Sequence, residues 1–247
     1  SQSYVTHSFE APLHTMDVTG GGTVRLLEAL RTQAPSARMY QASSSEQFGN
    51  ALMSPQTEET PFRPISPYGC AKVYAHTMCV TYREAYRMFI CCGIAYNHES
   101  PRRGEEFVTR KITQAVTQIH AGHQSILHLG NIQARRDWSH AKDIVYGAWL
   151  MLQQPNPEDY ILASGETHSV LEFARTAFAH VGLDADQYVR SLPSLQRPTD
   201  VQQLQGLPDK ARRVLGWVST ITFPQLVTEM VEADCAAVEH RNSIEIH

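Results

Sequence analysis

The stretch 43-SSSEQFGNALMSPQTEETPFRPISPYGCAK-72 joins two polar motifs through a proline-rich loop. Before it, the short bounded segment 38–42 predicts a strand, so the SSSE motif follows the carboxyl end of that strand. After the loop, Ser66 suits a helix N-cap, and Pro67 has the fixed φ of a first helical position. The stretch therefore predicts a strand, a loop and a helix. Open α/β sheets bind their ligands at the carboxyl ends of such strands.

Tyr68 and Lys72 form the pair in this stretch that favours proton-transfer chemistry. Their spacing of four places both side chains on one helix face. A free tyrosine has a pKa of about 10, and a neighbouring ammonium lowers that pKa by favouring the phenolate. Taken alone, Tyr-x-x-x-Lys is more often a partly buried ring beside a solvated charge. The preceding serines, together with Glu46 as a second acid or base, favour the catalytic interpretation.

Hydrophobic spacing elsewhere predicts alternating helices and strands. We expect helices over residues 20–34, 67–86, 107–121 and 141–153, and strands over 88–96, 125–129 and 160–163. The capping boxes Ser169-x-x-Glu172 and Thr222-x-x-Gln225 predict two further helix starts. Residues 1–16 are polar and predict a loop. The alternation indicates an α/β protein with a doubly wound parallel sheet.

The composition describes an ordinary globular chain of 247 residues with a net charge of −4, which argues against a general nucleic-acid binder. No apolar run approaches the roughly 18 residues that span a membrane, and no signal-peptide pattern is present, so we expect no membrane contact and a cytoplasmic location. The five cysteines lack metal-type spacing and predict reduced core thiols without a metal site; they are Cys70, Cys79, Cys91, Cys92 and Cys235.

Two longer motifs carry a family resemblance. The run SSSExFG followed by SPYxxxK resembles the extended short-chain dehydrogenase/reductases that act on nucleotide sugars. The run 97-NHESPRRGEEFVTRK-111, with 129-LGN-131 and 136-RDWSHAKD-143, resembles GDP-mannose 4,6-dehydratases. Long runs of near-consecutive matches are far more specific than Tyr-x-x-x-Lys alone.

The resemblance implies an internal redox elimination on a GDP-linked sugar with NADP as the cofactor. A hydride leaves sugar C4, C5 loses a proton, water departs from C6, and the hydride returns to C6. By this resemblance Tyr68 takes the C4 hydroxyl proton, and Lys72 lowers the pKa of Tyr68 and holds the nicotinamide ribose. Glu46 would move the C5 proton to the leaving hydroxyl. Ser44 replaces a family threonine and would hydrogen-bond the C4 oxygen; the lost methyl group predicts a slower enzyme.

Further positions match the ligand contacts of the family. The resemblance assigns NADP to Gln2, Ser3, Tyr68, Lys72, His98 and Arg103. It assigns GDP-mannose to Asn97, Val108, Lys111, Arg136, Arg197 and Asp200. Asp200 replaces a glutamate, so its carboxylate is one carbon shorter and its contact with the guanosine ribose is in doubt.

The family usually opens with a Gly-x-x-Gly-x-x-Gly phosphate turn that this sequence does not show. The run 20-GGG-22 does not replace it, because no strand pattern precedes these glycines. We therefore expect an N-terminally truncated Rossmann-type sheet with a smaller C-terminal substrate-binding α/β domain. Residues 1–96 would be the remaining NADP-binding part, to which segments near 129–165 return, and 97–247 would mainly bind the GDP-sugar.

Three functions remain open from the sequence. The first is GDP-mannose 4,6-dehydratase, acting as a homodimer or homotetramer in which the 102–106 loop contacts a neighbour's cofactor site. The second is another nucleotide-sugar dehydratase, epimerase or reductase; Glu46 argues for a dehydratase, because simple 4-epimerases need no C5 base. The third is an inactive GDP-sugar-binding fragment, since backbone N–H groups of the missing turn supply much of the diphosphate binding.

Overall fold

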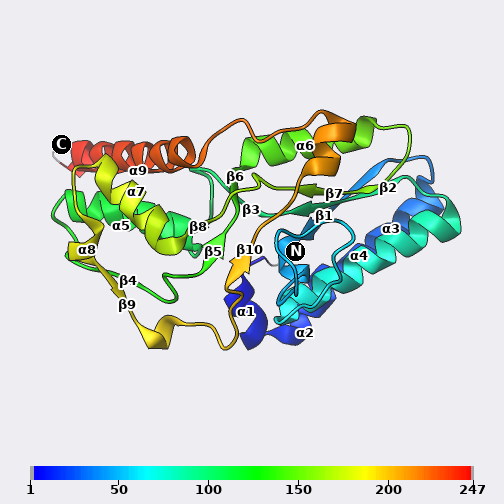
Figure 1. Cartoon of the computed structure of the whole chain (residues 1–247), viewed down its shortest axis with the longest axis horizontal. Helices are drawn as coiled ribbons and strands as arrows, with labels where there is room; N and C mark the ends of the chain where they lie inside the picture. Colours follow the sequence, from blue (N-terminus) through cyan, green and yellow to red (C-terminus); the bar gives the residue numbers. More distant parts are fainter. Residues whose placement is uncertain (1–2, 246–247) are drawn as a thin grey trace.

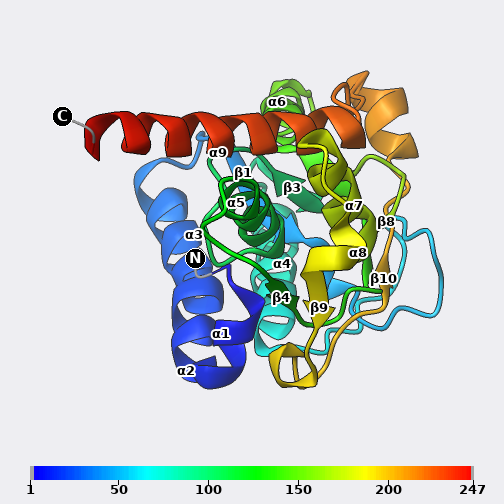
Figure 2. The same ribbon diagram turned by 90° about the vertical axis from the view of Figure 1, so that its left-hand side faces the viewer.

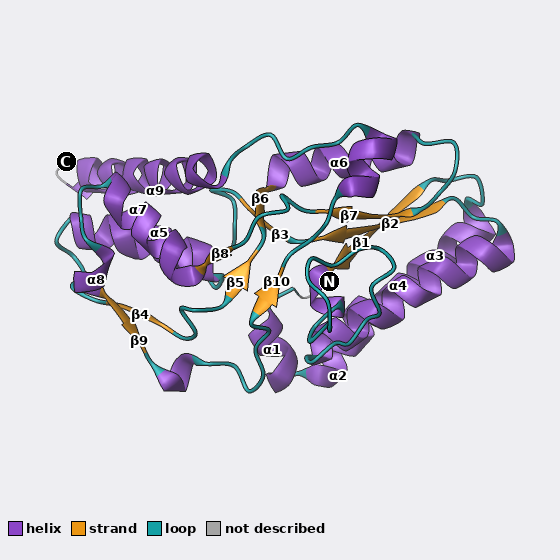
Figure 3. Ribbon diagram, viewed as in Figure 1, coloured by secondary structure: helices purple, strands orange, loops and turns teal. Residues whose placement is uncertain are grey.

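The computed structural model describes residues 3–245. Its centre is a parallel three-stranded sheet in the order β1–β2–β7, formed by β1 (Met39–Ser44), β2 (Ile90–Ala95) and β7 (Asp159–Leu162). Helices α3 (Gly22–Gln33) and α4 (Pro67–Tyr86) lie on one side of this sheet, and α6 (Ala141–Gln153) covers the other (Figures 1 and 3). This is the doubly wound α/β arrangement that the sequence predicted.

Alternating side chains of β2 explain why both faces of the sheet are covered. Every residue of β2 is buried. Cys91 packs with Ile144 and Met151 of α6, whereas Cys92 packs toward Cys79 of α4. An unbroken apolar strand is typical of a parallel sheet between two helical layers. All five cysteines are free thiols, but only Cys79, Cys91 and Cys92 are buried; the prediction of core thiols is wrong for Cys70, which is exposed on α4, and for Cys235, which is half-buried.

A second group of elements packs around its own core. Helices α5 (Val108–His120), α7 (Val170–His180) and α9 (Phe223–Glu245) pack together, and α9 lies across α5 and α7 (Figure 2). Trp138, Phe173 and Phe178 are the largest side chains of this core. The β4 (Leu127–Leu129) and β9 (Val189–Ser191) pair borders it, with the short α8 (Ala185–Tyr188) before β9.

Short strand pairs connect the two groups. Strand β3 (Asn97–Glu99) pairs in parallel with β6 (Trp138–His140) directly after β2. A further sheet has the order β10–β5–β8, formed by β10 (Gln203–Leu204), β5 (Arg135–Arg136) and β8 (His168–Ser169). Helical turns η3 (Pro193–Leu195) and η4 (Ala211–Leu215) complete the C-terminal segments. The division into domains at residue 96 stays a prediction.

The predicted loop over residues 1–16 is wrong. The chain forms α1 (Val5–Glu10), α2 (Pro12–Thr15) and a π-helical segment, η1 (Met16–Gly21), which runs into α3. These turns pack on α4 and bury Val5, Ser8 and Thr15. Gly20 permits the close approach, because a Cβ there would lie 2.8 Å from Cδ1 of Tyr74. Tertiary packing, which leaves little periodic signal in such short turns, overrides the polar composition.

Within residues 3–245, no helix combines the length and apolar character needed to cross a bilayer. The best-predicted elements are α4 and α6, whose observed bounds equal those expected. Ser66 accepts a hydrogen bond from the Gly69 amide at 3.0 Å, and Ser169 and Glu172 form the predicted capping box. The α4 boundary came from its capping side chain and the α6 boundary from hydrophobic spacing, so both kinds of signal gave accurate boundaries.

A buried ion pair joins α4 to the sheet. Nε2 of His76 lies 3.4 Å from Oδ2 of Asp159, and Nη1 of Arg83 lies 2.7 Å from Oδ1 of the same carboxylate. Burial opposes the charge of His76, but Asp159 and Cys92 raise its pKa to about 9. Burial likewise opposes the charge of Asp159, and His76 and Arg83 outweigh it and lower that pKa. The folded protein therefore keeps His76 protonated at neutral pH.

We expect the free energy of unfolding to fall between pH 6.5 and 8. Because folding raises the pKa of His76 from 6.5 to about 9, the unfolded chain loses a proton in this window that the folded protein retains. One such group contributes a slope of at most about 1.4 kcal/mol per pH unit, hence a fall of roughly 1–2 kcal/mol. Burial lowers the pKa of Lys72 to about 8, so its opposite contribution begins within this window but reaches only about 0.4 kcal/mol by pH 8.

Urea titrations at pH 6.5 and pH 8 measure this fall. His76→Gln should remove most of it, because the titrating group is gone. His120→Gln, at an exposed position on α5, is the matched control and should leave the fall unchanged. An equal fall in His76→Gln and in the unsubstituted protein would contradict the assignment.

Candidate active site

A cavity of about 480 Å³ opens at the carboxyl ends of β1 and β2 and extends between the two groups of elements. It is lined by every predicted site residue that the structure describes: Ser3, Ser44, Glu46, Tyr68, Lys72, Asn97, His98, Arg103, Val108, Lys111, Arg136, Arg197 and Asp200. Gln2 lies outside the described residues. Residues separated by more than 190 positions in the sequence therefore line the same cavity.

The end of β1 is fixed by a capping box. Ser44 is the N-cap of a 3-10 turn, η2 (Ser45–Gln47): its hydroxyl accepts from the Glu46 amide at 3.2 Å, and its own amide donates to Oε1 of Gln47 at 2.9 Å. The side-chain amide of Gln47 donates to the Lys72 carbonyl at 3.1 Å. The turn that carries Ser44 and Glu46 is thus tied to α4, which carries Tyr68 and Lys72.

Tyr68 and Lys72 lie on the buried face of α4. Nζ of Lys72 donates to the Ala42 carbonyl at 2.7 Å and lies 5.6 Å from the centroid of the Tyr68 ring. Burial raises the pKa of Tyr68 to about 12, and a hydrogen bond from Ser44 partly opposes this. The predicted lowering of the Tyr68 pKa is wrong for this structure. Desolvation of the phenolate outweighs the stabilising groups around it.

His98 and Arg103 form the next part of the lining. Nδ1 of His98 lies 2.8 Å from the Tyr96 carbonyl oxygen, and burial lowers the pKa of His98. The neutral ring therefore donates through Nδ1 and leaves Nε2 as an acceptor. Arg103 pairs with Glu99, its Nε lying 3.2 Å from Oε2, and its guanidinium lies 3.5 Å above the Phe107 ring. Both side chains are thus held by the segment that follows β2.

The far end of the cavity is organised by Asp200. Its carboxylate accepts from Nη2 of Arg136 at 2.9 Å and from Nδ2 of Asn131 at 3.1 Å. Nη1 of Arg197 lies 3.7 Å from the same carboxylate. Arg136 also donates to the Val201 carbonyl at 2.7 Å. Two guanidinium groups are therefore held at one wall by a single acid.

Sequence reasoning missed Asn131 as a member of this wall. The motif Leu129-Gly130-Asn131 was the available signal, and the structure shows what it does. A Cβ on Gly130 would lie 2.5 Å from the Leu195 carbonyl oxygen, so only glycine lets the 193–197 segment approach. That approach brings Arg197 and Asp200 beside Asn131. Tyr4 and Glu106 also line the cavity and were not predicted.

Comparisons with known proteins identify the family of the chain. The family described as GDP-mannose 4,6 dehydratase matches residues 1–230. The chain belongs to that family. It is 46% identical to GDP-mannose 4,6 dehydratase from Drosophila melanogaster over 253 residues, covering 95% of this chain and 64% of the fly protein. It is 50% identical to GDP-mannose 4,6 dehydratase 2 from Arabidopsis thaliana over 238 residues, covering 95% and 64% of the two chains. The family member described here thus spans slightly under two thirds of these relatives.

Solved structures share the fold at low sequence identity. RMD from Pseudomonas aeruginosa complexed with NADPH superposes with a TM-score of 0.87 at 21% identity, over 96% of this chain and 79% of that one. The dTDP-glucose 4,6-dehydratase DesIV from Streptomyces venezuelae, with NAD and TYD bound, gives 0.86 at 22% identity, over 98% and 72%. These likenesses confirm the Rossmann-type fold class.

Proposed function

We propose that this chain carries the active site of an NADP-dependent GDP-mannose 4,6-dehydratase, which forms GDP-4-keto-6-deoxymannose. The observation that carries the proposal is the meeting of Tyr68, Lys72, Ser44 and Glu46 in one cavity with the Arg136–Asp200 wall. A dehydratase needs one group to move the C4 hydroxyl proton and another to move the C5 proton to the leaving oxygen. The phenol and the carboxyl are two such groups on separate elements.

The chain's own residues would divide this work as follows. Tyr68 would accept the C4 hydroxyl proton as a phenolate, a form that burial disfavours in this structure and that must therefore be generated on ligand binding, and Ser44 would hold the C4 oxygen. Glu46 moves the C5 proton to the C6 oxygen as water leaves. Because burial lowers the pKa of Lys72 to about 8, this amine retains its proton at neutral pH but gives it up more readily than a solvated lysine does.

The nicotinamide end of a dinucleotide suits the donors of this cavity. A bound NADP would accept a hydride from sugar C4 and return it to C6. Lys72 and Tyr68 would hold the nicotinamide ribose, since Nζ of Lys72 is presented at the end of β1. Ser3, His98 and Arg103 would contact the remainder, because a guanidinium matches phosphate geometry. Gln2, which the resemblance also assigns to NADP, belongs to this proposal.

The GDP-sugar would lie along the opposite wall. Arg136 and Arg197 supply guanidinium groups for the diphosphate, and Asp200 sits between them. Asn97, Val108 and Lys111 line the intervening space at β3 and the start of α5. Since Asp200 already accepts from Arg136 and Asn131, we assign it to orienting these two side chains as well as to the guanosine ribose.

Two assays test this proposal. Titration calorimetry with NADP and with GDP-mannose measures each binding step separately, and turnover is then compared on GDP-mannose, UDP-glucose and dTDP-glucose. Binding of both ligands with turnover of GDP-mannose alone supports the proposal. Turnover of another nucleotide sugar supports the second function, a different dehydratase, epimerase or reductase. Binding of GDP-mannose without NADP supports a GDP-sugar-binding module.

Asp200→Asn is expected to raise the KM for GDP-mannose about tenfold, equivalent to roughly 1.4 kcal/mol, with kcat changed less than about twofold. The amide would place an NH2 group against Arg136 or Asn131 and disturb the wall, while the reacting atoms lie elsewhere. Initial-rate kinetics at saturating NADP measure both constants. Asp186→Asn, in an exposed pair with Arg175, is the matched control. A fall in kcat with unchanged KM would contradict this placement.

Assembly and location complete the proposal. We propose a homodimer or homotetramer in which the 102–106 loop lies near a neighbour's cofactor site. Analytical ultracentrifugation measures the assembly. A reducing compartment such as the cytoplasm suits the buried thiols of Cys79, Cys91 and Cys92.

A further inference from the structure

His76 occupies a position on α4 that the proposed chemistry does not use. It follows Tyr68 and Lys72 at successive spacings of four, so all three lie on the same helix face. The ring is buried, with only 6% of its surface exposed. Nδ1 of His76 lies 2.9 Å from Oγ of Ser43, and Nε2 lies 3.4 Å from Oδ2 of Asp159. His76 therefore bridges the end of β1 and the start of β7.

The contacts continue beyond Asp159. Arg83, two turns further along α4, donates to the Asp159 carboxylate at 2.7 and 3.3 Å and to the Ile90 carbonyl at 3.1 Å. One chain of polar contacts thus ties α4 to β1, β2 and β7, the three strands of the central sheet. Such a chain fixes the helix along its axis as well as against the sheet.

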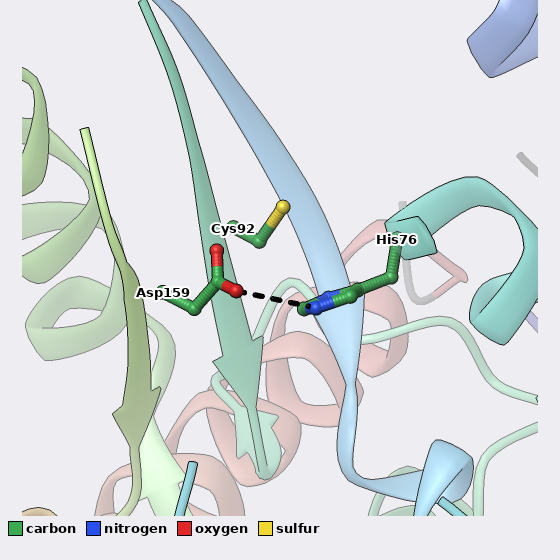
Figure 4. Close-up of side chains that lie close together, drawn as sticks. All are labelled: His76, Cys92 and Asp159. Atoms are coloured by element: carbon green, nitrogen blue, oxygen red, sulfur yellow. Dashed lines mark ion pairs between the residues drawn. The ribbon is translucent and has the colours of Figure 1, made fainter. Parts of the chain in front are cut away.

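Two other interpretations of this cluster fail on its charges. Figure 4 shows the side chains of His76, Cys92 and Asp159 converging as metal ligands do. However, the Asp159 carboxylate already pairs with His76 at 3.4 Å and with Arg83 at 2.7 Å, so both of its oxygens are satisfied without a metal. His76 also lies between a serine and an aspartate, Ser43 and Asp159, as the histidine of a hydrolytic triad does. A protonated His76 cannot take a proton from Ser43.

A protonated His76 donates at both nitrogens, which determines the role of Ser43. Its Oγ accepts from Nδ1, and the amide link to Ser44 transmits that restraint to a residue that lines the same cavity as Tyr68 and whose hydroxyl favours the Tyr68 phenolate. Ser44 has an extended backbone, with φ −149° and ψ 141°, immediately before η2. The position of the Ser44 hydroxyl relative to the Tyr68 phenol therefore depends on the position of the end of β1 along α4.

We propose that His76 is a positioning residue that acts through Ser43 to hold Ser44 against Tyr68. It touches neither of the reacting groups. A displacement of the order of 1 Å in a reacting constellation can cost about a hundredfold in rate, so a contact one residue away suffices for a measurable effect. The turnover consequence rests on the proposed dehydratase function, whereas the geometric consequence for Tyr68 does not.

Two substitutions of His76 separate its two hydrogen bonds. In His76→Asn the side-chain amide nitrogen takes the place of Nδ1, which preserves the contact with Ser43 and removes that with Asp159. In His76→Gln the amide nitrogen takes the place of Nε2, which preserves the contact with Asp159 and removes that with Ser43. Both lose the same charge, so each is the control for the other. Ser43→Ala removes the hydroxyl that contacts His76. His120→Gln is the control for replacing a histidine at an exposed position.

We expect His76→Gln and Ser43→Ala to lower kcat about tenfold or more with KM for GDP-mannose unchanged, and His76→Asn to lower it less than about threefold. Equal losses in His76→Asn and His76→Gln that follow a common fall in Tm would overturn the proposal. So would full activity in His76→Gln.

A second measurement applies even if the protein does not turn over GDP-mannose, which would contradict the proposed function alone. NMR of the protein labelled with 13C at tyrosine Cζ reports the hydrogen bond at Tyr68, and Tyr68→Phe identifies its signal. The signal should shift in His76→Gln and Ser43→Ala and stay in place in His76→Asn. A signal that moves in none of them, or in all three, would refute the role of His76.

Discussion

Tyr68→Phe is expected to reduce turnover of GDP-mannose about a thousandfold while leaving the protein folded. The phenol is the only hydroxyl on α4 that lines the cavity in the described part of the chain, and acid–base catalysis by one positioned group contributes about 10²–10⁴-fold. The ring is 7% exposed, so phenylalanine keeps its packing. The lost hydrogen bond to Ser44 should change the free energy of unfolding by only about 1 kcal/mol.

Rates of GDP-mannose consumption at saturating NADP measure this effect. Tyr86→Phe, at the exposed end of the same helix, is the matched control and should keep the activity of the unsubstituted protein. Calorimetry with GDP-mannose should show unchanged binding in Tyr68→Phe, because the wall at Asp200 is untouched. If Tyr68→Phe retains more than about a tenth of the activity, Tyr68 is not the base and the carboxyl of Glu46 must be reconsidered.

The motifs predicted residues that line one cavity, but they did not predict the electrostatics of that cavity. The residues assigned from motifs meet because motif spacing encodes placement: the capped start of α4 and the hydroxyls after β1 both lie at one sheet edge. The pKa of Tyr68 could not be predicted, because its direction depends on how much water the fold removes. Neighbouring charges can be read from a sequence, but burial cannot.

Long-range contacts made by single residues were also beyond the sequence. No motif marks His76, and its partners Ser43 and Asp159 stand 33 positions before and 83 positions after it. The helices α1 and α2 have no capping side chain from which their starts could be predicted. Where local chemistry specifies an element, as Ser169 does for α7, prediction succeeded; where packing alone specifies it, prediction failed.

Asp137 is the residue for which we expect the largest loss of stability on substitution. Its carboxylate is fully buried between β5 and β6 and accepts four hydrogen bonds. Oδ1 accepts from the amide and hydroxyl of Ser164 at 2.8 and 2.7 Å, and Oδ2 accepts from the amides of Gly165 and Gly206 at 2.9 and 3.3 Å. Asp137 thereby holds the segment after β7 and the segment after β10 against the junction of β5 and β6.

Asp137→Asn is expected to lower the free energy of unfolding by about 3 kcal/mol. An NH2 group in place of Oδ2 faces the N–H donors of Gly165 and Gly206, whereas an NH2 group in place of Oδ1 faces the N–H of Ser164 and a hydroxyl that can accept from it. Even the second orientation leaves the Ser164 N–H unpaired and replaces a charged acceptor, whose hydrogen bonds are worth about 1.5–3 kcal/mol each, by a neutral one. Relief of the buried charge acts in the opposite direction, since burial raises the pKa of Asp137, but the unpaired donor and the weakened contacts outweigh that relief.

Urea denaturation at pH 7 measures the change, with Asp209→Asn, in an exposed pair with Arg212, as the matched control. A loss below about 1 kcal/mol would mean that relief of the charge balances the lost contacts. The same urea titration at pH 5 then shows whether Asp137 is ionised in the folded protein. If Asp137 stays ionised in the folded protein at both pH values, the difference between the two proteins is the same at pH 5 and at pH 7. If burial keeps Asp137 protonated in the folded protein at pH 7 while the unfolded chain is ionised, the difference grows by about 1.4 kcal/mol per pH unit toward pH 5.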